Sequence, residues 1–187
     1  MSLPLACRLC AGWPPGLSAV RSAVWLDAGA RRAVHLLKYE GWWRISEAMA
    51  LPMRRLFSTG APVSLIPIPL GTTRLRTRGY NQSAVLARAV GQWLGEPVAE
   101  HALRRRRDTR TQTALTPEER RANLSGAFVA QGRPPENIVL VDDVFTTGAT
   151  LVEAAEALMA AGAAGVTGVT FARAPRPLAD AEAMPIT

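Results

Sequence analysis

The sequence has few of the residues that build metal centres and disulfide frameworks. Its 187 residues include two cysteines, Cys7 and Cys10, and two histidines, His35 and His101. A disulfide framework needs more cysteines than this, and a closed tetrahedral zinc site needs four ligands. We therefore expect no bound zinc and interpret Cys7 and Cys10 as an incidental thiol pair, the alternative being one half of a metal site.

Long apolar stretches are also missing. No apolar run approaches the roughly 20 residues that a membrane-spanning helix needs. The first residues, from Met1 to Cys7, are too short and too broken a stretch for a signal peptide. We therefore expect a cytoplasmic protein with no membrane insertion. A hydrophobic content of 48% over 187 residues predicts one domain with at most a short appendage.

Lysine is nearly absent. Lys38 is the only lysine among the 22 basic residues, which outnumber 15 acidic ones and give a formal net charge of +7. Arginine binds phosphate and carboxylate groups through pairs of parallel hydrogen bonds. The charge therefore favours a phosphate-bearing partner, either a small molecule or a nucleic acid. The alternative is a basic surface that only faces solvent.

Strand-like and helix-like segments alternate along the chain, which is typical of an α/β fold with a mainly parallel sheet. Pro52 should kink or divide the second helix. The polar segments 71–79 and 104–125 are expected to be loops. Apolar runs and helical spacings predict, in order, strand 20–26, helices 30–39 and 42–57, strand 62–69, helix 81–94, strands 97–103, 127–130 and 137–141, a helix starting at Thr147 or Thr150, and strand 162–171.

The segment 139–150, Val-Leu-Val-Asp-Asp-Val-Phe-Thr-Thr-Gly-Ala-Thr, joins a predicted buried strand to a helix. Ligands of open α/β sheets bind at the carboxyl ends of strands, and a helix N-terminus offers free N–H groups to a phosphate. Hydroxyls and a glycine would complete a phosphate site, and two carboxylates would hold sugar hydroxyls directly or through Mg²⁺. The alternative is a plain strand–turn–helix with solvated acids and threonine caps. The residues concerned are Asp142, Asp143, Thr146, Thr147, Gly148 and Thr150.

This segment resembles the motif with which type I phosphoribosyltransferases bind 5-phosphoribosyl-1-pyrophosphate (PRPP). In that family two acidic residues contact the ribose hydroxyls, and the following loop surrounds the 5′-phosphate. The resemblance implies that Asp142 and Asp143 bind the ribose and Mg²⁺. It implies a 5′-phosphate loop made of Phe145, Thr146, Thr147, Gly148, Ala149 and Thr150, with Ala149 where many members have a second glycine.

Further segments resemble one branch, the ComF (competence protein F, GntX-like) family. Residues 36–41, Leu-Leu-Lys-Tyr-Glu-Gly, are similar to its Leu-Lys-Tyr-x-Gly element. Residues 67–70 and 74–82 resemble its Pro-Val-Pro-Leu and Arg-Gly-Phe-Asn-Gln elements, and positions between Arg107 and Phe128 resemble the element that follows. The resemblance spans roughly residues 20 to 173 and is much more specific than any single motif.

The resemblance implies the type I phosphoribosyltransferase fold, a twisted and mainly parallel sheet flanked by helices, with a small hood and a flexible loop. It divides the chain into a short N-terminal segment (1–19), the phosphoribosyltransferase domain (20–174) and a C-terminal tail (175–187) that we expect to fray. Family members commonly carry an N-terminal zinc module with two Cys-x-x-Cys pairs. The single pair in this sequence would be a remnant of that module.

The resemblance also assigns roles to two loops. Arginines of a pyrophosphate loop would neutralise the diphosphate, although Gly71-Thr72-Thr73 replaces the His-Pro-Arg of many members. A flexible loop within 104–123 would close over the site. The alternatives are a solvated basic turn and a disordered insertion. The pyrophosphate loop comprises Pro69, Leu70, Arg74, Arg76 and Arg78, and the flexible loop contains Arg107, Thr109, Gln112, Arg120 and Asn123.

Two functions of different classes fit these features. One is a Mg²⁺-dependent transfer of phosphoribose from PRPP to an unidentified acceptor, with release of pyrophosphate. The other is a non-catalytic transformation factor that binds PRPP and single-stranded DNA. The basic run 104–107 and an exposed Trp42–Trp43 pair would serve DNA, whereas Trp25 and Trp93 are expected to be core residues. A homodimer is compatible with either function.

The cysteine count leads to a first prediction. Because only two plausible ligands cluster in the sequence, purified protein should not hold one tightly bound zinc per chain. Elemental analysis of the protein after chelator treatment measures this. Stoichiometric zinc that resists the chelator would contradict the prediction and would require ligands from a second site or a second protomer.

Overall fold

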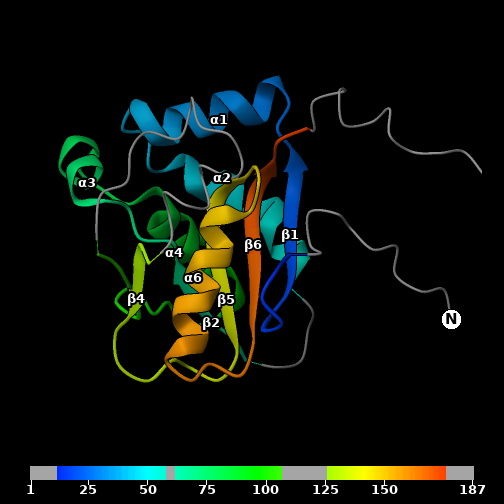
Figure 1. Ribbon diagram of the computed structural model, residues 1–187. Coiled ribbons are helices and arrows are strands. Elements are labelled where there is room, and N and C mark those ends of the chain that lie inside the picture. The colour runs from blue at the N-terminus through cyan, green and yellow to red at the C-terminus, as the bar shows by residue number, and fades with distance from the viewer. Residues whose placement is uncertain (1–11, 58–61, 107–125, 176–187) are drawn as a thin grey trace, which may run out of the picture.

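The computed structural model describes residues 12–57, 62–106 and 126–175, which form an α/β structure around a parallel sheet (Figure 1). Every neighbouring pair of its four strands is parallel, so the carboxyl ends of the strands lie at one edge. This confirms the expected α/β class with a mainly parallel sheet. In spatial order, the strands are β1 (Leu17–Trp25), β6 (Val166–Arg173), β5 (Ile138–Phe145) and β2 (Ser64–Pro67).

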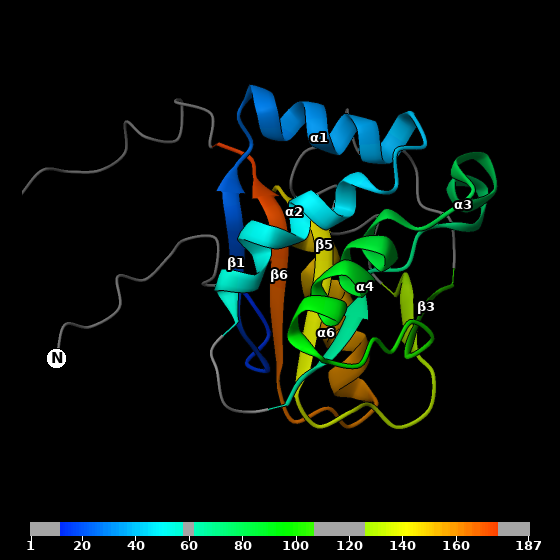
Figure 2. The same ribbon diagram turned by 180° about the vertical axis from the view of Figure 1, so that it is seen from behind.

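Helices cover both faces of this sheet. They are α1 (Ala28–Tyr39), α2 (Ile45–Met53) with the 3-10 turn η1 (Arg54–Leu56), α3 (Thr72–Arg78), α4 (Gln82–Leu94) and α6 (Ala149–Ala160). Helices α2 and α4 lie on one face, α6 lies on the other, and α1 crosses above the carboxyl edge (Figures 1 and 2). None of the helices in the described part of the chain is long and apolar enough to span a membrane.

The core has one layer on each face of the sheet, and β5 contributes to both. Its residues Val139 and Val141 pack in the layer under α2 and α4, whereas Ile138 and Leu140 pack in the layer under α6. This follows from the alternation of side chains along a strand. A strand that is buried on both faces reads as a continuous apolar run, which explains why β5 was predictable. It also makes β5 a rigid support for the residues at its end.

Local sequence signals fix the ends of two helices that border the sheet edge. The Asp27 carboxylate accepts a hydrogen bond from the Ala30 N–H at 2.8 Å and caps α1. Asn81 caps α4 in the same way by accepting from the Ser83 N–H at 3.1 Å. Helix α4 ends at Gly95, whose φ of 73° lies in the left-handed region that glycine adopts without strain. Both ends of α4 agree with the sequence analysis, whereas α1 begins two residues before the expected start at Ala30.

The expectation of a loop over 71–79 is wrong, because this segment contains the helix α3. No residue of α3 is buried, so the helix lacks the apolar periodicity by which a buried helix is recognised. Its ends are nevertheless marked by glycine. Gly71 precedes the first turn, and Gly79 ends the helix with a φ of 84°.

Two expected boundaries near the sheet are also corrected. Strand β5 continues to Phe145, so both acidic residues lie inside the strand and not after its end. The reason is that β5 stays paired with β6 as far as Arg173. The strand expected at 97–103 is reduced to one bridge between Leu65 and Val98, and the short β3 (Leu103–Arg105) then pairs with β4 (Phe128–Ala130).

Candidate functional site

A cavity of about 910 Å³ opens at the carboxyl edge of the sheet. Its lining comes from β5, from α1, and from the segment between β2 and α4 that includes α3. The fold therefore brings together parts of the chain that are far apart in the sequence. Of the predicted site residues, the cavity is lined by Pro69, Leu70, Arg74, Arg78, Asp142, Asp143, Thr146 and Thr150.

The two carboxylates of β5 are held by different kinds of partner. The Ser83 hydroxyl donates to Asp142 Oδ1 at 2.8 Å, and the Asp143 N–H donates to the same oxygen at 2.9 Å. Asp143 is 3% exposed, and its Oδ2 has no hydrogen-bond partner within the described ranges. The Lys38 Nζ lies 2.5 Å from that oxygen. The contact is a close ion pair between the Lys38 ammonium and the Asp143 carboxylate.

Lys38 is the site residue that sequence analysis missed. It lies in the last turn of α1, its side chain is 22% exposed, and it lines the cavity. Burial by itself lowers the pKa of Lys38, but the charges of Asp143 and Asp142 outweigh burial and raise the pKa above its usual value. The residue is therefore an ammonium ion at neutral pH. The signal that could have found it is its rarity, since it is the only lysine of the chain.

Asp142 has an ionisation equilibrium near neutral pH. Burial raises the pKa of Asp142 to about 7, and the negative charge of Asp143 acts in the same direction. The Lys38 charge and the hydrogen bonds from Ser83 and from the Asp143 N–H oppose the shift. Part of Asp142 remains accessible from the cavity, so a ligand cation can still reach it.

One short segment, from Tyr80 to Ser83, connects the walls of the cavity. The Tyr80 hydroxyl donates to the Leu37 carbonyl of α1, and the Asn81 side-chain amide donates to the Ile68 carbonyl after β2 at 2.9 Å. Ser83 then reaches Asp142. The Arg-Gly-Tyr-Asn-Gln element thus positions three parts of the site, whereas the sequence analysis gave a role only to its arginine.

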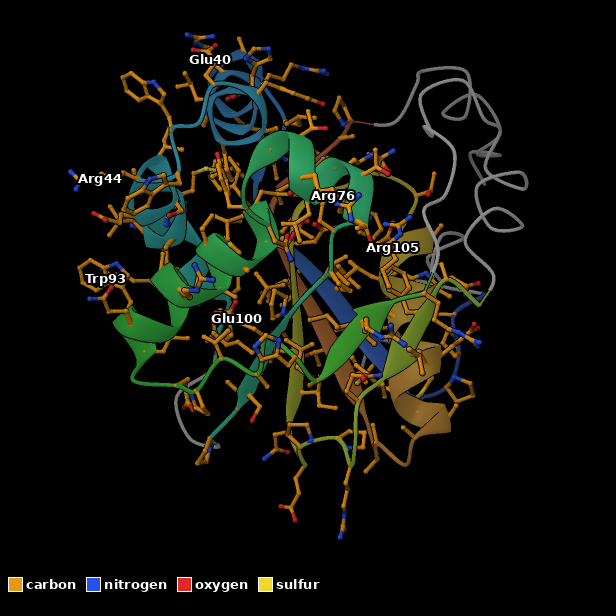
Figure 3. All side chains as sticks on the ribbon, turned by 90° about the vertical axis from the view of Figure 1, so that its left-hand side faces the viewer. Glu40, Arg44, Arg76, Trp93, Glu100 and Arg105 are labelled. Carbon is orange, nitrogen blue, oxygen red and sulfur yellow. The ribbon has the colours of Figure 1, made fainter. Side chains whose placement is uncertain are left out.

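The arginines of α3 are divided between the cavity and the surface. Arg74 and Arg78 are four residues apart, so they lie on one side of the helix, and both line the cavity. Arg76 is exposed and is not among the lining residues. Arg105 of β3, which the sequence analysis placed in the flexible loop without naming it as a site residue, also lines the cavity, and its guanidinium lies 5.4 Å from the centre of the Phe128 ring. Figure 3 shows Arg76 and Arg105 on α3 and β3.

The turn between β5 and α6 is shaped by Phe145 and Gly148. Phe145 is 1% exposed, so its ring packs beneath the turn and does not face the cavity. Gly148 has a φ of 81°, and a Cβ added to it would lie 2.9 Å from the Phe145 ring. Only glycine fits both constraints. Thr147 accepts from the Ala149 N–H at 3.5 Å, which leaves Thr146 and Thr150 as the hydroxyls that face the cavity.

The acid pair suits a hard cation whose remaining ligands come from a bound phosphate. Mg²⁺ prefers oxygen ligands and commonly uses one or two carboxylates together with substrate phosphates. Among the described residues, no group of three or more His, Cys, Asp or Glu side chains could hold a metal by itself. Outside the described residues lie the other candidates, Cys7, Cys10, Arg107, Thr109, Gln112, Arg120 and Asn123.

Tryptophan is unusually exposed on this molecule. The expectation that Trp25 and Trp93 belong to the core is wrong, since they are 66% and 53% exposed. Trp25 is the last residue of the edge strand β1, and Trp93 lies in the last turn of α4, beyond its buried residues. Trp42 and Trp43 are exposed, as expected.

An arginine guanidinium lies over the ring of two of these tryptophans. The Arg44 guanidinium lies 5.3 Å from the centre of the Trp43 ring, and the Arg54 guanidinium lies 5.3 Å from that of Trp93. Figure 3 shows Arg44 and Trp93 projecting from the same edge of the molecule. Helices α2 and α4, which border these residues, are packed against each other. The pairs lie at the two ends of α2, and we refer to Trp43, Arg44, Arg54 and Trp93 together as the Trp–Arg surface.

Comparison with known proteins places this chain among competence and DNA utilization proteins. No family model matches it. Competence protein F of Haemophilus influenzae is 36% identical over 125 residues, which are 65% of this chain and 55% of that protein. The DNA utilization protein YhgH of Salmonella typhi is 35% identical over 169 residues, 84% of this chain and 73% of that protein. Competence protein ComFC of Bacillus subtilis is 28% identical over 172 residues, 86% of this chain and 69% of that protein.

The raised pKa of Asp142 makes the stability of the ligand-free protein depend on pH. A carboxyl whose pKa is raised from 3.8 to about 7 on folding favours the folded state at low pH, and this contribution is lost as the pH rises through 7. Asp142→Asn removes the ionisation. We compare the melting temperature of the variant with that of wild type at each pH. The difference in favour of the variant should be larger at pH 8 than at pH 5 by on the order of 5 °C, since 1 kcal/mol of stability corresponds to about 2–4 °C.

Differential scanning calorimetry in matched buffers measures this difference. Glu136→Gln, which removes an exposed carboxylate from the loop before β5, is the control and should show no such growth. A melting-temperature difference between Asp142→Asn and wild type that stays constant from pH 5 to pH 8 would contradict the prediction.

Proposed function

The chain belongs to the ComF family, and we propose that it binds PRPP together with Mg²⁺ in the cavity at the carboxyl edge of its sheet. The observation that carries this proposal is the arrangement of opposite charges in one cavity. Asp142 and Asp143 come from β5, whereas Arg74 and Arg78 come from α3. A ligand that is both a polyanion and a metal chelator satisfies both sets of residues, and PRPP is such a ligand.

Each part of PRPP has a counterpart in the cavity. The 5′-phosphate would lie at the N-terminus of α6, where free N–H groups and the hydroxyls of Thr146 and Thr150 face it. The ribose hydroxyls and Mg²⁺ would bind the two carboxylates. The diphosphate would lie toward Arg74 and Arg78, whose guanidinium groups bind phosphate bidentately.

We infer that the chain has the type I phosphoribosyltransferase fold, with the domain over 20–174 flanked by the segments 1–19 and 175–187. The parallel sheet and its flanking helices support this inference. In this proposal, α1 serves as the hood, because it crosses above the sheet edge and lines the cavity. The proposed flexible loop over the site falls largely on residues outside those described, so its role stays a prediction.

The reaction that such a site supports is a transfer of phosphoribose. The bond from ribose C1 to the diphosphate oxygen breaks, a nucleophilic atom of the acceptor bonds to C1, and pyrophosphate leaves with the bonding electron pair. Negative charge grows on the leaving diphosphate, so fixed cations beside it lower the barrier. Arg74 and Arg78 would supply that stabilisation, and bound Mg²⁺ would add to it.

We propose a second function, the binding of single-stranded DNA, on the Trp–Arg surface. Nonspecific single-strand binding combines aromatic rings that stack on bases with cations that meet the phosphates. Here each of two exposed tryptophans already has an arginine beside it. The names of the relatives, competence and DNA utilization proteins, support a role of this kind. The basic run at 104–106 would extend the charge, since Arg104 and Arg106 are exposed.

Isothermal calorimetry of PRPP binding tests the first proposal. Wild type should bind PRPP in the presence of Mg²⁺ and much more weakly in EDTA. The double variant Asp142→Asn/Asp143→Asn should bind on the order of a hundredfold more weakly, because each charged hydrogen bond contributes about 1.5–3 kcal/mol. Glu136→Gln is the matched control and should bind like wild type. Equal binding by the double variant, or none by wild type, would reject the proposal. Gly148→Val would also alter the proposed 5′-phosphate loop, but it is unsuitable as a test of PRPP binding because the valine side chain would collide with the Phe145 ring.

Fluorescence anisotropy with a labelled oligothymidylate tests the second proposal. Wild type should bind at low salt, and affinity should fall steeply as salt rises because counterions are released. Trp43→Ala/Trp93→Ala should bind at least tenfold more weakly, since stacking contributes about 1–3 kcal/mol per base. Trp25→Ala, which removes an exposed tryptophan from the end of β1, is the control. No detectable binding at low salt would reject DNA binding by this surface.

A further inference from the structure

The only lysine of the chain contacts Asp143, one of the two carboxylates to which the proposed function assigns Mg²⁺. Its Nζ lies 2.5 Å from Asp143 Oδ2, an oxygen that has no hydrogen-bond partner within the described ranges. The carboxylate is almost completely buried, with 4% of its side chain exposed.

The backbone position of Lys38 is fixed by the fold. Lys38 lies in the last turn of α1, and the Tyr80 hydroxyl is bonded to the carbonyl of the preceding residue, Leu37. Tyr80 belongs to the same short segment that places Ser83 on Asp142. The two acids therefore receive their neutral donor and their cation from one connected framework.

An ammonium ion and a divalent cation compete for this oxygen. Mg²⁺ binds oxygen at about 2.0–2.1 Å, and a second cation at hydrogen-bonding distance from the same oxygen would repel it strongly at a buried site. Removing the ammonium without a replacement is equally unfavourable, because a buried carboxylate pair then lacks a counter-ion. Binding of one cation at Oδ2 therefore disfavours binding of the other at the same oxygen.

We propose that Lys38 is a tethered cation that takes the place of the divalent metal on Asp143 until PRPP binds and then moves to the diphosphate. This inference rests on the proposed function, and it adds that metal and PRPP enter the site together. Lys38 lines the same cavity as Arg74 and Arg78. Its four-carbon stem allows the ammonium to move, which the planar guanidinium of arginine would do less readily. The diphosphate supplies the negative charge that makes the new position favourable.

The consequence is a coupling between the two ligands. Without PRPP, Lys38 excludes the metal from Asp143, so the metal alone binds weakly. With PRPP, the ammonium has a second anionic partner, and Asp143 becomes available to the metal. By linkage, each ligand raises the affinity of the protein for the other by the same factor. Lys38→Met should reduce this factor.

Binding of Mn²⁺ alone, followed by electron paramagnetic resonance, tests the proposal directly. Wild type should bind Mn²⁺ weakly in the absence of PRPP. Lys38→Met, which keeps the length of the stem and removes the charge, should bind Mn²⁺ at least tenfold more tightly. Lys38→Met/Asp143→Asn should lose that gain. Arg133→Met is the control for net charge, because it removes one exposed cation from the loop before β5, at the opposite end of the strand from Asp143. If Lys38→Met binds Mn²⁺ no more tightly than wild type, the proposal is wrong.

A measurement on wild type decides the matter if Lys38→Met does not fold. Because the sequence contains one lysine, protein labelled with ¹³C and ¹⁵N lysine gives a single side-chain ammonium signal without any assignment step. Mg²⁺ alone should leave this signal in place, whereas Mg²⁺ with PRPP should shift it. The proposal would be overturned if Mg²⁺ alone shifted the ammonium signal as far as Mg²⁺ with PRPP does, or if the two ligands together produced no shift.

These experiments separate the inference from the function on which it rests. Calorimetry that shows no PRPP binding by wild type would reject the proposed function, while the Mn²⁺ comparison would still show whether Lys38 blocks a metal site. Conversely, PRPP binding by wild type combined with unchanged Mn²⁺ binding by Lys38→Met would keep the function and reject the role of Lys38.

Discussion

Two adjacent carboxylates near the end of a strand buried on both faces are the constraint on which the rest of this structure depends. Burial of charge is costly unless each charged group finds partners. Asp142 finds them in the Ser83 hydroxyl and a backbone N–H, and Asp143 finds one in the Lys38 ammonium. Because Ser83 belongs to α4 and Lys38 to α1, the positions of both helices are tied to the acid pair.

The elements that frame the cavity contribute unequally to the core, and α1 buries Ala30, Val34 and Leu37 in it. Helix α3 buries no residue, yet it begins and ends at glycines and directs Arg74 and Arg78 into the cavity. The segment that follows it holds α1 through Tyr80 and the end of β2 through Asn81. Polar contacts between these segments therefore add to apolar packing in setting the shape of the cavity.

Cations of different kinds are placed in different environments. The one lysine is largely buried against a carboxylate, where a compact ammonium can approach a single oxygen. Arginines line the cavity beyond it and also lie over exposed tryptophans on α4 and before α2. Part of the excess positive charge of +7 thus lies in a concave site and part beside exposed tryptophans, the two places to which we assign PRPP and DNA in the proposed functions.

The sequence by itself determined the α/β class, the apolar first half of strand β5, and both ends of α4, because apolar periodicity and helix caps are local properties of the chain. It also identified the family, through short elements that can be read without a structure. It did not reveal helix α3, which has no buried face, or the exposure of Trp25 and Trp93, which depends on where β1 and α4 end relative to their neighbours.

Only the tertiary structure decided which residues meet at the acid pair. Ser83 and Asp142 are 59 positions apart in the sequence, and Lys38 is more distant still. Nothing in the local sequence of either acid indicates which helix will supply its partner. That pairing depends on α1 crossing above the sheet edge and α4 starting beside it, and both placements are set by packing between segments that are remote along the chain.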